Sequence, residues 1–407
     1  MDRQGTVRVT STAHCADRRM MSGFGSHVVS RFTASVAVLA LTVPAFGIAN
    51  AEPPSAELSL LESTLLPVVT QQMERMHIPG LLVSVQTPDR GSWQAALGVA
   101  DTATQAPMNL ADHMRVGSIT KSFTATVILQ LAQEGKLRLD DPLAPYFPEV
   151  DTNGATIRQA LQLTSGVADY TTIPFMNELA DHQQRVWSPE ELIGTIAGRP
   201  PMFPPGQGWY YSNTNYVMLG VIAERTAGQP LNQLFADRIF TPLAMTGCST
   251  PAPVDAAIPE PFSRGYQLGA DWGRPDSPPA PLPALIDVTD TNPSWGAGAG
   301  AAICTAADLT IWARALATGE LLDPAMQAQR LAFVPAGDPH AKYGLGVANI
   351  NGLVGHNGQV GGYMSQTARR ESDGTLIVVL TNLTAAPDNG EPATVISELI
   401  SRAIPSR

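Results

Sequence analysis

The sequence predicts an α+β fold: an antiparallel sheet flanked by helices and built from both chain ends, with an inserted, mostly helical domain. Short strand-like patterns lie near both ends of the chain, at 81–99 and 343–381. Between about 135 and 292 the chain shows mostly helical patterns and Pro-rich loops. This order favours a sheet assembled from distant segments. We expect the sheet domain at 52–112 and 296–407 and the helical domain at 113–295.

The composition excludes several classes of protein. Of the 407 residues 44% are apolar and 15% are charged, and 25 basic against 36 acidic side chains give a net charge of −11. This is not the composition of a disordered chain. An acidic chain also lacks the basic footprint that binds phosphates, so we expect no nucleic-acid partner. Three cysteines cannot build a disulfide scaffold or a four-thiolate zinc site.

The first 51 residues are predicted to be a secretory signal peptide. Arg31 precedes an uncharged, mostly apolar run at 34–49, which ends in the small-residue cleavage motif Ala49-Asn50-Ala51. The run is shorter than the roughly 20 residues that span a membrane. We therefore expect cleavage near Ala51, a secreted, cell-envelope or periplasmic protein, and no stable membrane span. Export would permit a disulfide between Cys248 and Cys304, but the sequence leaves their pairing and the true start codon open.

Periodicity and turn residues place the remaining elements. Helices are expected at 56–76, 118–135, 217–227, 231–238, 306–316 and 391–404. Strands are expected at 81–87, 92–99, 343–350, 353–356, 364–369 and 375–381.

Ser118 and Lys121 stand three residues apart at a predicted helix start, so their side chains share one face of the helix. A desolvated lysine can take the proton of a serine hydroxyl and activate the serine as a nucleophile. Free backbone N–H groups at a helix start can also bind an oxyanion. Taken alone, the spacing equally fits a helix cap followed by a solvated lysine.

Two further segments carry polar side chains that could take part in catalysis. Tyr211-Ser212-Asn213 offers a phenol that can relay a proton and an amide that can orient an amine or a carbonyl. His356-Asn357-Gly358 lies in a Gly-rich stretch that would let the backbone approach a ligand closely. Each segment, taken singly, could be structural. The other histidines show no metal-ligand spacing, so we expect no metal and no cofactor.

The sequence argues against dinucleotide binding and against an α/β-hydrolase. Residues 296–301 fit G-x-G-x-x-A, but Asn292-Pro293 precedes them in place of a strand, which argues against dinucleotide binding. The chain contains no G-x-S-x-G, so the nucleophile elbow of an α/β-hydrolase is absent.

In this order the three motifs resemble the serine β-lactamase and penicillin-binding-protein-like family and, within it, the branch of D-alanyl-D-alanine carboxypeptidases, class C β-lactamases and related esterases. The resemblance covers nearly the whole chain after the signal peptide and implies a β-lactamase/transpeptidase-like fold. The stretches that carry it are 116–123, 134–137, 156–158, 163–167, 211–216 and 355–358.

The resemblance also implies an acyl-enzyme mechanism with Ser118 as the nucleophile. Either Lys121, held beside Asn213, or Tyr211 would take the proton of Ser118. Tyr211 and His356 would protonate the leaving group and later activate water. The backbone N–H groups of Ser118 and Gln359 would form the oxyanion hole. Residues implied to contact the substrate are Trp295, Asn357, Gly358 and Gln359.

The third motif departs from the family pattern. Many relatives have His-Thr-Gly followed by a hydroxyl residue, whereas this chain has Asn357 and, after the glycine, Gln359. A carboxypeptidase needs a cation or hydroxyls for the free carboxylate of its substrate. No Lys or Arg occurs between Lys342 and Arg369. We therefore expect weak binding of a substrate carboxylate.

The sequence thus predicts a secreted serine hydrolase that acts on a small-molecule or peptidoglycan-peptide substrate and is acylated by β-lactams. D-alanyl-D-alanine carboxypeptidase activity is the leading prediction. An esterase or a β-lactamase of the same fold is one alternative. An alternative of another class is a penicillin-binding or sensing protein that is acylated without turnover.

Overall fold

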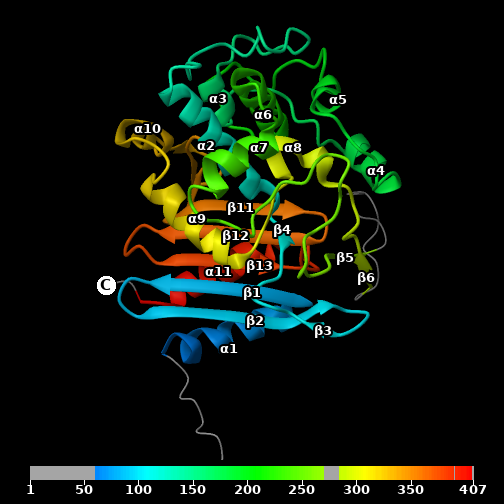
Figure 1. Cartoon of the computed structure of the whole chain (residues 1–407), viewed down its shortest axis with the longest axis vertical. Helices are drawn as coiled ribbons and strands as arrows, with labels where there is room; N and C mark the ends of the chain where they lie inside the picture. The colour runs from blue at the N-terminus through cyan, green and yellow to red at the C-terminus, as the bar shows by residue number, and fades with distance from the viewer. Residues whose placement is uncertain (1–59, 270–283, 389, 406–407) are drawn as a thin grey trace, which may run out of the picture. The chain divides into compact units, whose positions relative to one another are not determined.

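An antiparallel sheet of nine strands joins the two ends of the chain (Figure 1). The computed structural model describes residues 60–269, 284–388 and 390–405. The strand order is β3-β2-β1-β13-β12-β11-β10-β9-β8. The fold class predicted from the sequence is confirmed. The strands are β1 (Gly80–Thr87), β2 (Gly91–Asp101), β3 (Ala106–Pro107), β8 (Val334–Pro335), β9 (Ala341–Tyr343), β10 (Ala348–Ile350), β11 (Leu353–Val360), β12 (Tyr363–Arg370) and β13 (Leu376–Thr381).

Helices cover both faces of this sheet and fill the segment between its two halves. The helix α9 packs on one face, and α1 and α11 pack on the other (Figure 1). The helices are α1 (Leu60–Arg75), α2 (Thr120–Gln133), α3 (Ile157–Leu161), α4 (Ile173–Asp181), α5 (Pro189–Gly194), α6 (Asn213–Ala227), α7 (Leu231–Phe235), α8 (Ala297–Gly300), α9 (Ala306–Thr318), α10 (Pro324–Arg330) and α11 (Pro392–Ala403), with short turns η1 (Gly117–Ile119), η2 (Ala236–Phe240) and η3 (Pro293–Gly296).

The strand β1 shows why the sheet needs helices on both faces. Successive side chains of a strand point to opposite faces. Leu81 and Val83 are fully buried in the core with α1 and α11, whereas Leu82 belongs to the larger core with α2, α6 and α9. A strand that is apolar at consecutive positions is stable only when both faces are covered.

Two predictions about strands were wrong. The single strand expected at 343–350 is a hairpin of β9 and β10, because Gly344 and Gly346 turn the chain between them. A Cβ atom on Gly346 would lie 2.2 Å from the side chain of Ala125, so this turn packs directly on α2. The sequence also indicated no strand pair between about 135 and 292, yet β5 (Tyr266–Leu268) pairs with β6 (Leu285–Asp287).

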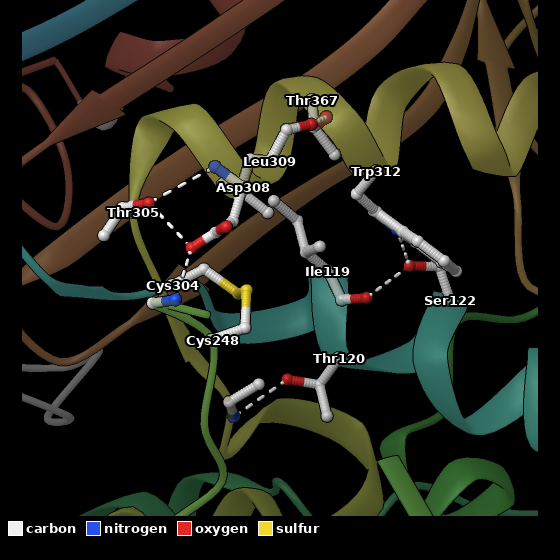
Figure 2. The surroundings of a disulfide bond; sticks show 12 residues. Ile119, Thr120, Ser122, Cys248, Cys304, Thr305, Asp308, Leu309, Trp312 and Thr367 are labelled. Carbon is white, nitrogen blue, oxygen red and sulfur yellow. Dashed lines mark hydrogen bonds between the residues drawn. A yellow bond between two sulfur atoms is a disulfide. The ribbon is translucent and has the colours of Figure 1, made fainter. Parts of the chain in front are cut away.

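A disulfide joins Cys248 to Cys304, the pairing that the sequence left open (Figure 2). Cys304 lies in β7 (Ile303–Cys304), which pairs with β4 (Met114–Arg115) just before η1. The neighbouring backbone N–H of Ala302 donates to Thr120 Oγ1 at 3.1 Å. The bond therefore fastens a distant loop beside the start of α2.

The described residues belong to one compact unit, Glu57–Arg407, and the domain boundaries predicted within it stay a prediction. The predicted signal peptide, residues 1–51, lies outside the described residues. Among the helices described, none has the length and apolar character needed to cross a membrane.

Candidate active site

Ser118 lies in η1, where the chain enters α2 and meets the edge of β11. Within the described part of the chain, β10 pairs with β11 only as far as Gly355, so the rest of this edge is left to η1. A Cβ atom on Gly358 would lie 2.0 Å from the carbonyl oxygen of Val116. Gly117 has a φ of +50°, and a Cβ atom on it would lie 2.8 Å from the backbone nitrogen of Gln359. Glycines at both positions therefore bring Ser118 against the backbone of β11.

Lys121 is fully buried in the first turn of α2, and its Nζ faces three oxygen atoms. The distances are 2.9 Å to Ser118 Oγ, 2.7 Å to Asn213 Oδ1 and 3.0 Å to the carbonyl oxygen of Ala299. A neutral amine has two N–H groups and one lone pair. Since the amide and carbonyl oxygens can only accept hydrogen bonds, the lone pair of a neutral Lys121 is left for the hydroxyl of Ser118.

The environment of Lys121 favours that neutral state. Burial lowers the pKa of Lys121 to about 7, against an opposing contribution from the negative charge of Asp169, which raises it. Desolvation penalises the charged form of an amine, so a substantial fraction of Lys121 is neutral near pH 7.

Tyr211 is the other base that the sequence left open. Its ring lies with its centroid 4.8 Å from Lys121 Nζ. Removal from bulk water raises the pKa of Tyr211 well above its ordinary value, and this outweighs a hydrogen bond with Ser118 that lowers it. At neutral pH Tyr211 therefore carries its proton and is a donor, whereas Lys121 is able to accept one.

Asp169 holds the amide of Asn213 in place, and the sequence analysis missed it. It accepts a hydrogen bond from the backbone N–H of Asn213 at 2.9 Å, and Asn213 Nδ2 lies 3.4 Å from its other oxygen. These contacts turn Asn213 Oδ1 toward Lys121. Asp169 follows the stretch 163–167 by two residues, and that proximity was the available signal.

His356 lies beneath the strand edge, away from the cavity wall. Its side chain is 1% exposed, with Nε2 2.9 Å from the hydroxyl of Tyr343 and Nδ1 2.6 Å from the carbonyl oxygen of Asn357. Burial, assisted by the charge of Lys121, lowers the pKa of His356 to about 4. The structure therefore gathers Ser118, Lys121 and Tyr211 at one place and keeps a neutral His356 apart from them.

A cavity of about 340 Å³ opens over Ser118. All four residues that the family resemblance implies as substrate contacts line it. Tyr170 and Glu391, which the sequence analysis missed, line it as well. Tyr170 donates a hydrogen bond to the carbonyl oxygen of Trp295. The lining residues are Ser118, Tyr170, Tyr211, Asn213, Trp295, Gly296, Ala299, Gly300, Asn357, Gly358, Gln359, Val360 and Glu391. A larger surface hollow of about 730 Å³ near residues 178–185 holds none of the catalytic candidates.

The G-x-G-x-x-A segment at 296–301, for which the sequence argued against dinucleotide binding, forms part of the wall of this cavity. It spans the end of η3 and the short α8, and Gly296, Ala299 and Gly300 line the wall. Among the described residues, no three His, Cys, Asp or Glu side chains lie close enough together to hold a metal ion.

Comparison with known proteins is consistent with this geometry. The family model described as Beta-lactamase matches residues 67–399. Penicillin-binding protein 4* of Bacillus subtilis is 30% identical over 152 residues, which cover 37% of this chain and 33% of that relative. The chain thus spans about a third of the length of that curated relative.

Two solved structures match most of this chain. A D-stereospecific amidohydrolase from Streptomyces sp. is 31% identical with a TM-score of 0.69, and the match covers 79% of this chain and 95% of that one. The D-amino acid amidase from Ochrobactrum anthropi SV3, in complex with D-phenylalanine, is 25% identical with a TM-score of 0.74 and covers 84% and 97%.

Proposed function

The chain belongs to the Beta-lactamase family as a serine hydrolase, and we propose that it hydrolyses amide bonds formed by D-amino acids through an acyl-enzyme on Ser118. One observation carries the proposal: Lys121 Nζ lies 2.9 Å from Ser118 Oγ, and burial lowers the pKa of Lys121 to about 7. A base with a pKa near the operating pH is the most effective one for a proton transfer of this kind.

In the acylation step, Ser118 Oγ attacks the substrate carbonyl while its proton passes to the lone pair of Lys121. The C–N bond of the tetrahedral intermediate then breaks, and the leaving amine takes the proton from Lys121 by way of the hydroxyl of Tyr211, whose ring lies beside Lys121 Nζ. The backbone N–H groups of Ser118 and Gln359 would hold the oxyanion, which is supported by the close approach of Gly117 to Gln359.

In the deacylation step, a water molecule attacks the ester carbonyl and gives a proton to Lys121, which passes it to Ser118 Oγ as the C–O bond of the tetrahedral intermediate breaks. Tyr211, whose raised pKa keeps it protonated, would donate a hydrogen bond to Ser118 Oγ as this oxygen leaves. His356 would act from behind the strand as a positioning residue, because its partners are Tyr343 and its own chain.

The substrate class is supported by two kinds of observation. The solved structures that match the chain include proteins described as a D-stereospecific amidohydrolase and a D-amino acid amidase. D-alanyl-D-alanine peptides, the leading prediction from the sequence, belong to the same chemical class. However, none of the described residues that line the cavity is Lys or Arg, which favours substrates without a free carboxylate.

Export from the cytoplasm is part of the proposal. The disulfide between Cys248 and Cys304 supports it, because such bonds persist in oxidising compartments. N-terminal sequencing of protein recovered from the cell envelope or medium tests it: a start near Glu52 is expected, and an intact N-terminus in the cytoplasm would contradict export.

The decisive experiment maps the nucleophile. The protein is incubated with a fluorescent penicillin and separately with a fluorophosphonate, and the adduct is located by peptide mass spectrometry. We expect labelling on Ser118 that disappears in Ser118→Ala and persists in Ser372→Ala, an exposed serine away from the cavity. A turnover panel of a D-amino acid amide, a D-Ala-D-Ala peptide, a short acyl ester and a chromogenic β-lactam then separates the activities. Labelling at another residue would overturn the proposal.

A further inference from the structure

We propose that Glu391 makes this active site selective for substrates that carry an ammonium group near the scissile bond and unfavourable for substrates that carry a free carboxylate there. The inference rests on the proposed function, because it concerns the same cavity and the same acyl transfer. It narrows the substrate class to free amino-acid amides, amino esters and peptides with an unblocked amino group.

Glu391 comes from a part of the chain far from the three motifs, yet it shares one cavity with Ser118, Tyr211 and Gln359. It stands immediately before α11, and its side chain is exposed. Its Oε2 accepts hydrogen bonds from Asn357 Nδ2 at 3.1 Å and from Thr394 Oγ1 at 2.9 Å. No described residue donates a hydrogen bond to Oε1, so this oxygen can accept one from a ligand in the cavity.

The hydrogen bond from Asn357 fixes where the negative charge lies. Asn357 and Gln359 project from the same face of β11, since alternate residues of a strand share a face. The side chain of Asn357 lines the cavity beside Glu391. One N–H of its amide donates to the carboxylate of Glu391, and this bond holds the anion beside the strand at the cavity wall.

No positive side chain offsets this charge at the cavity wall. None of the described lining residues is Lys or Arg, and Lys121 lies below the wall with its Nζ directed at three oxygen atoms. Glu391 also occupies the N-terminal end of α11, the position at which a helix could otherwise attract an anion. The charge is felt at the reacting groups, because Glu391 contributes, after burial and Asp169, to the raised pKa of Tyr211.

The negative charge of Glu391 discriminates between substrates that carry an ammonium group and substrates that carry a free carboxylate. An ammonium group near Oε1 of Glu391 would form a charge-assisted hydrogen bond. The free carboxylate of a D,D-carboxypeptidase substrate at the same place would be repelled and would find no cation. The geometry therefore points to the amino-acid amides and aminopeptides among D-amino acid substrates.

A matched pair of substrates tests the inference: D-phenylalanine p-nitroanilide, whose amino group is free, and its N-acetyl derivative. We expect the wild-type protein to favour the free amine by at least about tenfold in kcat/KM, the size of a modest charge-assisted hydrogen bond. In Glu391→Gln this ratio should fall below about threefold. High salt should reduce the ratio in the wild type and leave it unchanged in Glu391→Gln, since the carboxylate is exposed to solvent.

Two further variants complete the test. Glu398→Gln removes a negative charge from the outer part of α11, where Glu398 binds Asn351 and Arg402, and should keep the wild-type ratio. Glu391→Lys should shift preference toward a diacyl D-Ala-D-Ala peptide, which carries a carboxylate. An unchanged ratio in Glu391→Gln, or a wild-type preference for the acetylated substrate, would overturn the inference while Ser118 labelling stays intact. Loss of Ser118 labelling by the fluorophosphonate, whose reacting group carries no carboxylate, would instead overturn the proposed function.

Discussion

The two sides of the cavity differ in how their polar groups are used. On the helical side, which consists of Ser118, Lys121, Tyr211 and Asn213, each polar side chain contacts another member of the same set. On the strand side, which consists of Asn357, Gln359 and Glu391, none of the three contacts the helical set: Asn357 donates to Glu391, and Gln359 donates to the carbonyl oxygen of Thr384. The difference indicates that the buried helical side carries the groups for acylation, whereas the more exposed strand side can determine which substrate binds.

The largest expected effect comes from removing the base of the helical side. Lys121→Met should lower the acylation rate about 10²–10⁴-fold, the usual contribution of a positioned general base. Burst kinetics with a chromogenic ester measure this rate. Lys136→Met, which removes an exposed lysine paired with Glu134, is the matched control and should leave the rate unchanged. A loss of less than tenfold in Lys121→Met would show that Tyr211 or another group is the base.

The close contact between the two sides can be disturbed with one methyl group. In Gly358→Ala the new Cβ atom would lie 2.0 Å from Val116 O, so the strand must move away from Ser118. We expect a loss of about 1–3 kcal/mol in the free energy of unfolding, as for other overpacked sites, together with at least about a tenfold loss in kcat/KM, because small displacements of reacting groups are costly.

Thermal or denaturant unfolding and steady-state kinetics check both effects of Gly358→Ala. Gly194→Ala, where a Cβ atom would meet open space, serves as the control. It should unfold at the same temperature or denaturant concentration as the wild type, or at a slightly higher one. Wild-type activity in Gly358→Ala would mean that the approach of β11 to Ser118 is not required.

His356 lies behind the strand side, and the family resemblance implies a catalytic role for it whereas the structure buries its ring away from the cavity. His356→Gln should reduce kcat/KM by less than about tenfold. It should also cost about 1–3 kcal/mol of stability, since the buried hydroxyl of Tyr343 loses its contact with His356 and keeps only a longer one, 3.4 Å, to the hydroxyl of Tyr216. Tyr343→Phe should remove the same interaction, so the two changes should not add. A loss of 10²-fold or more at unchanged stability would return His356 to the catalytic machinery.

The helical side could be predicted from the sequence because its central contact is local. Ser118 and Lys121 meet through the regular geometry of one helix, and Asn213 belongs to the motif that follows. The longer strands β1, β2, β12 and β13 were also predicted, although 343–350 was predicted as one strand because the turn at Gly344 and Gly346 depends on packing against α2.

On the strand side Asn357 and Gln359 were predicted from the third motif, but Glu391 could not be predicted, because its contact with the site spans a long stretch of chain. Asn357 and Glu391 are 34 residues apart. Asp169, which was missed on the helical side, is likewise 44 residues from its partner Asn213. Nothing near Glu391 in the sequence indicates a binding residue. The strand β11 also runs to Val360, beyond the predicted end at 356, so alternation sends His356 to one face and Asn357 to the other.

The pH dependence of acylation tests the central claim, a neutral Lys121 as the base for Ser118, most directly. The second-order rate of labelling by a fluorophosphonate is measured between about pH 5 and 9, in the wild type and in Asp169→Asn. Because Lys121 must lose its proton before it can accept one, the rate should rise with pH and reach half its maximum near the pKa of Lys121, about 7. Asp169→Asn removes a charge that raises this pKa, so its midpoint should lie at a lower pH. A rate that does not change with pH, or one that still rises steeply at pH 9 in both proteins, would contradict the account.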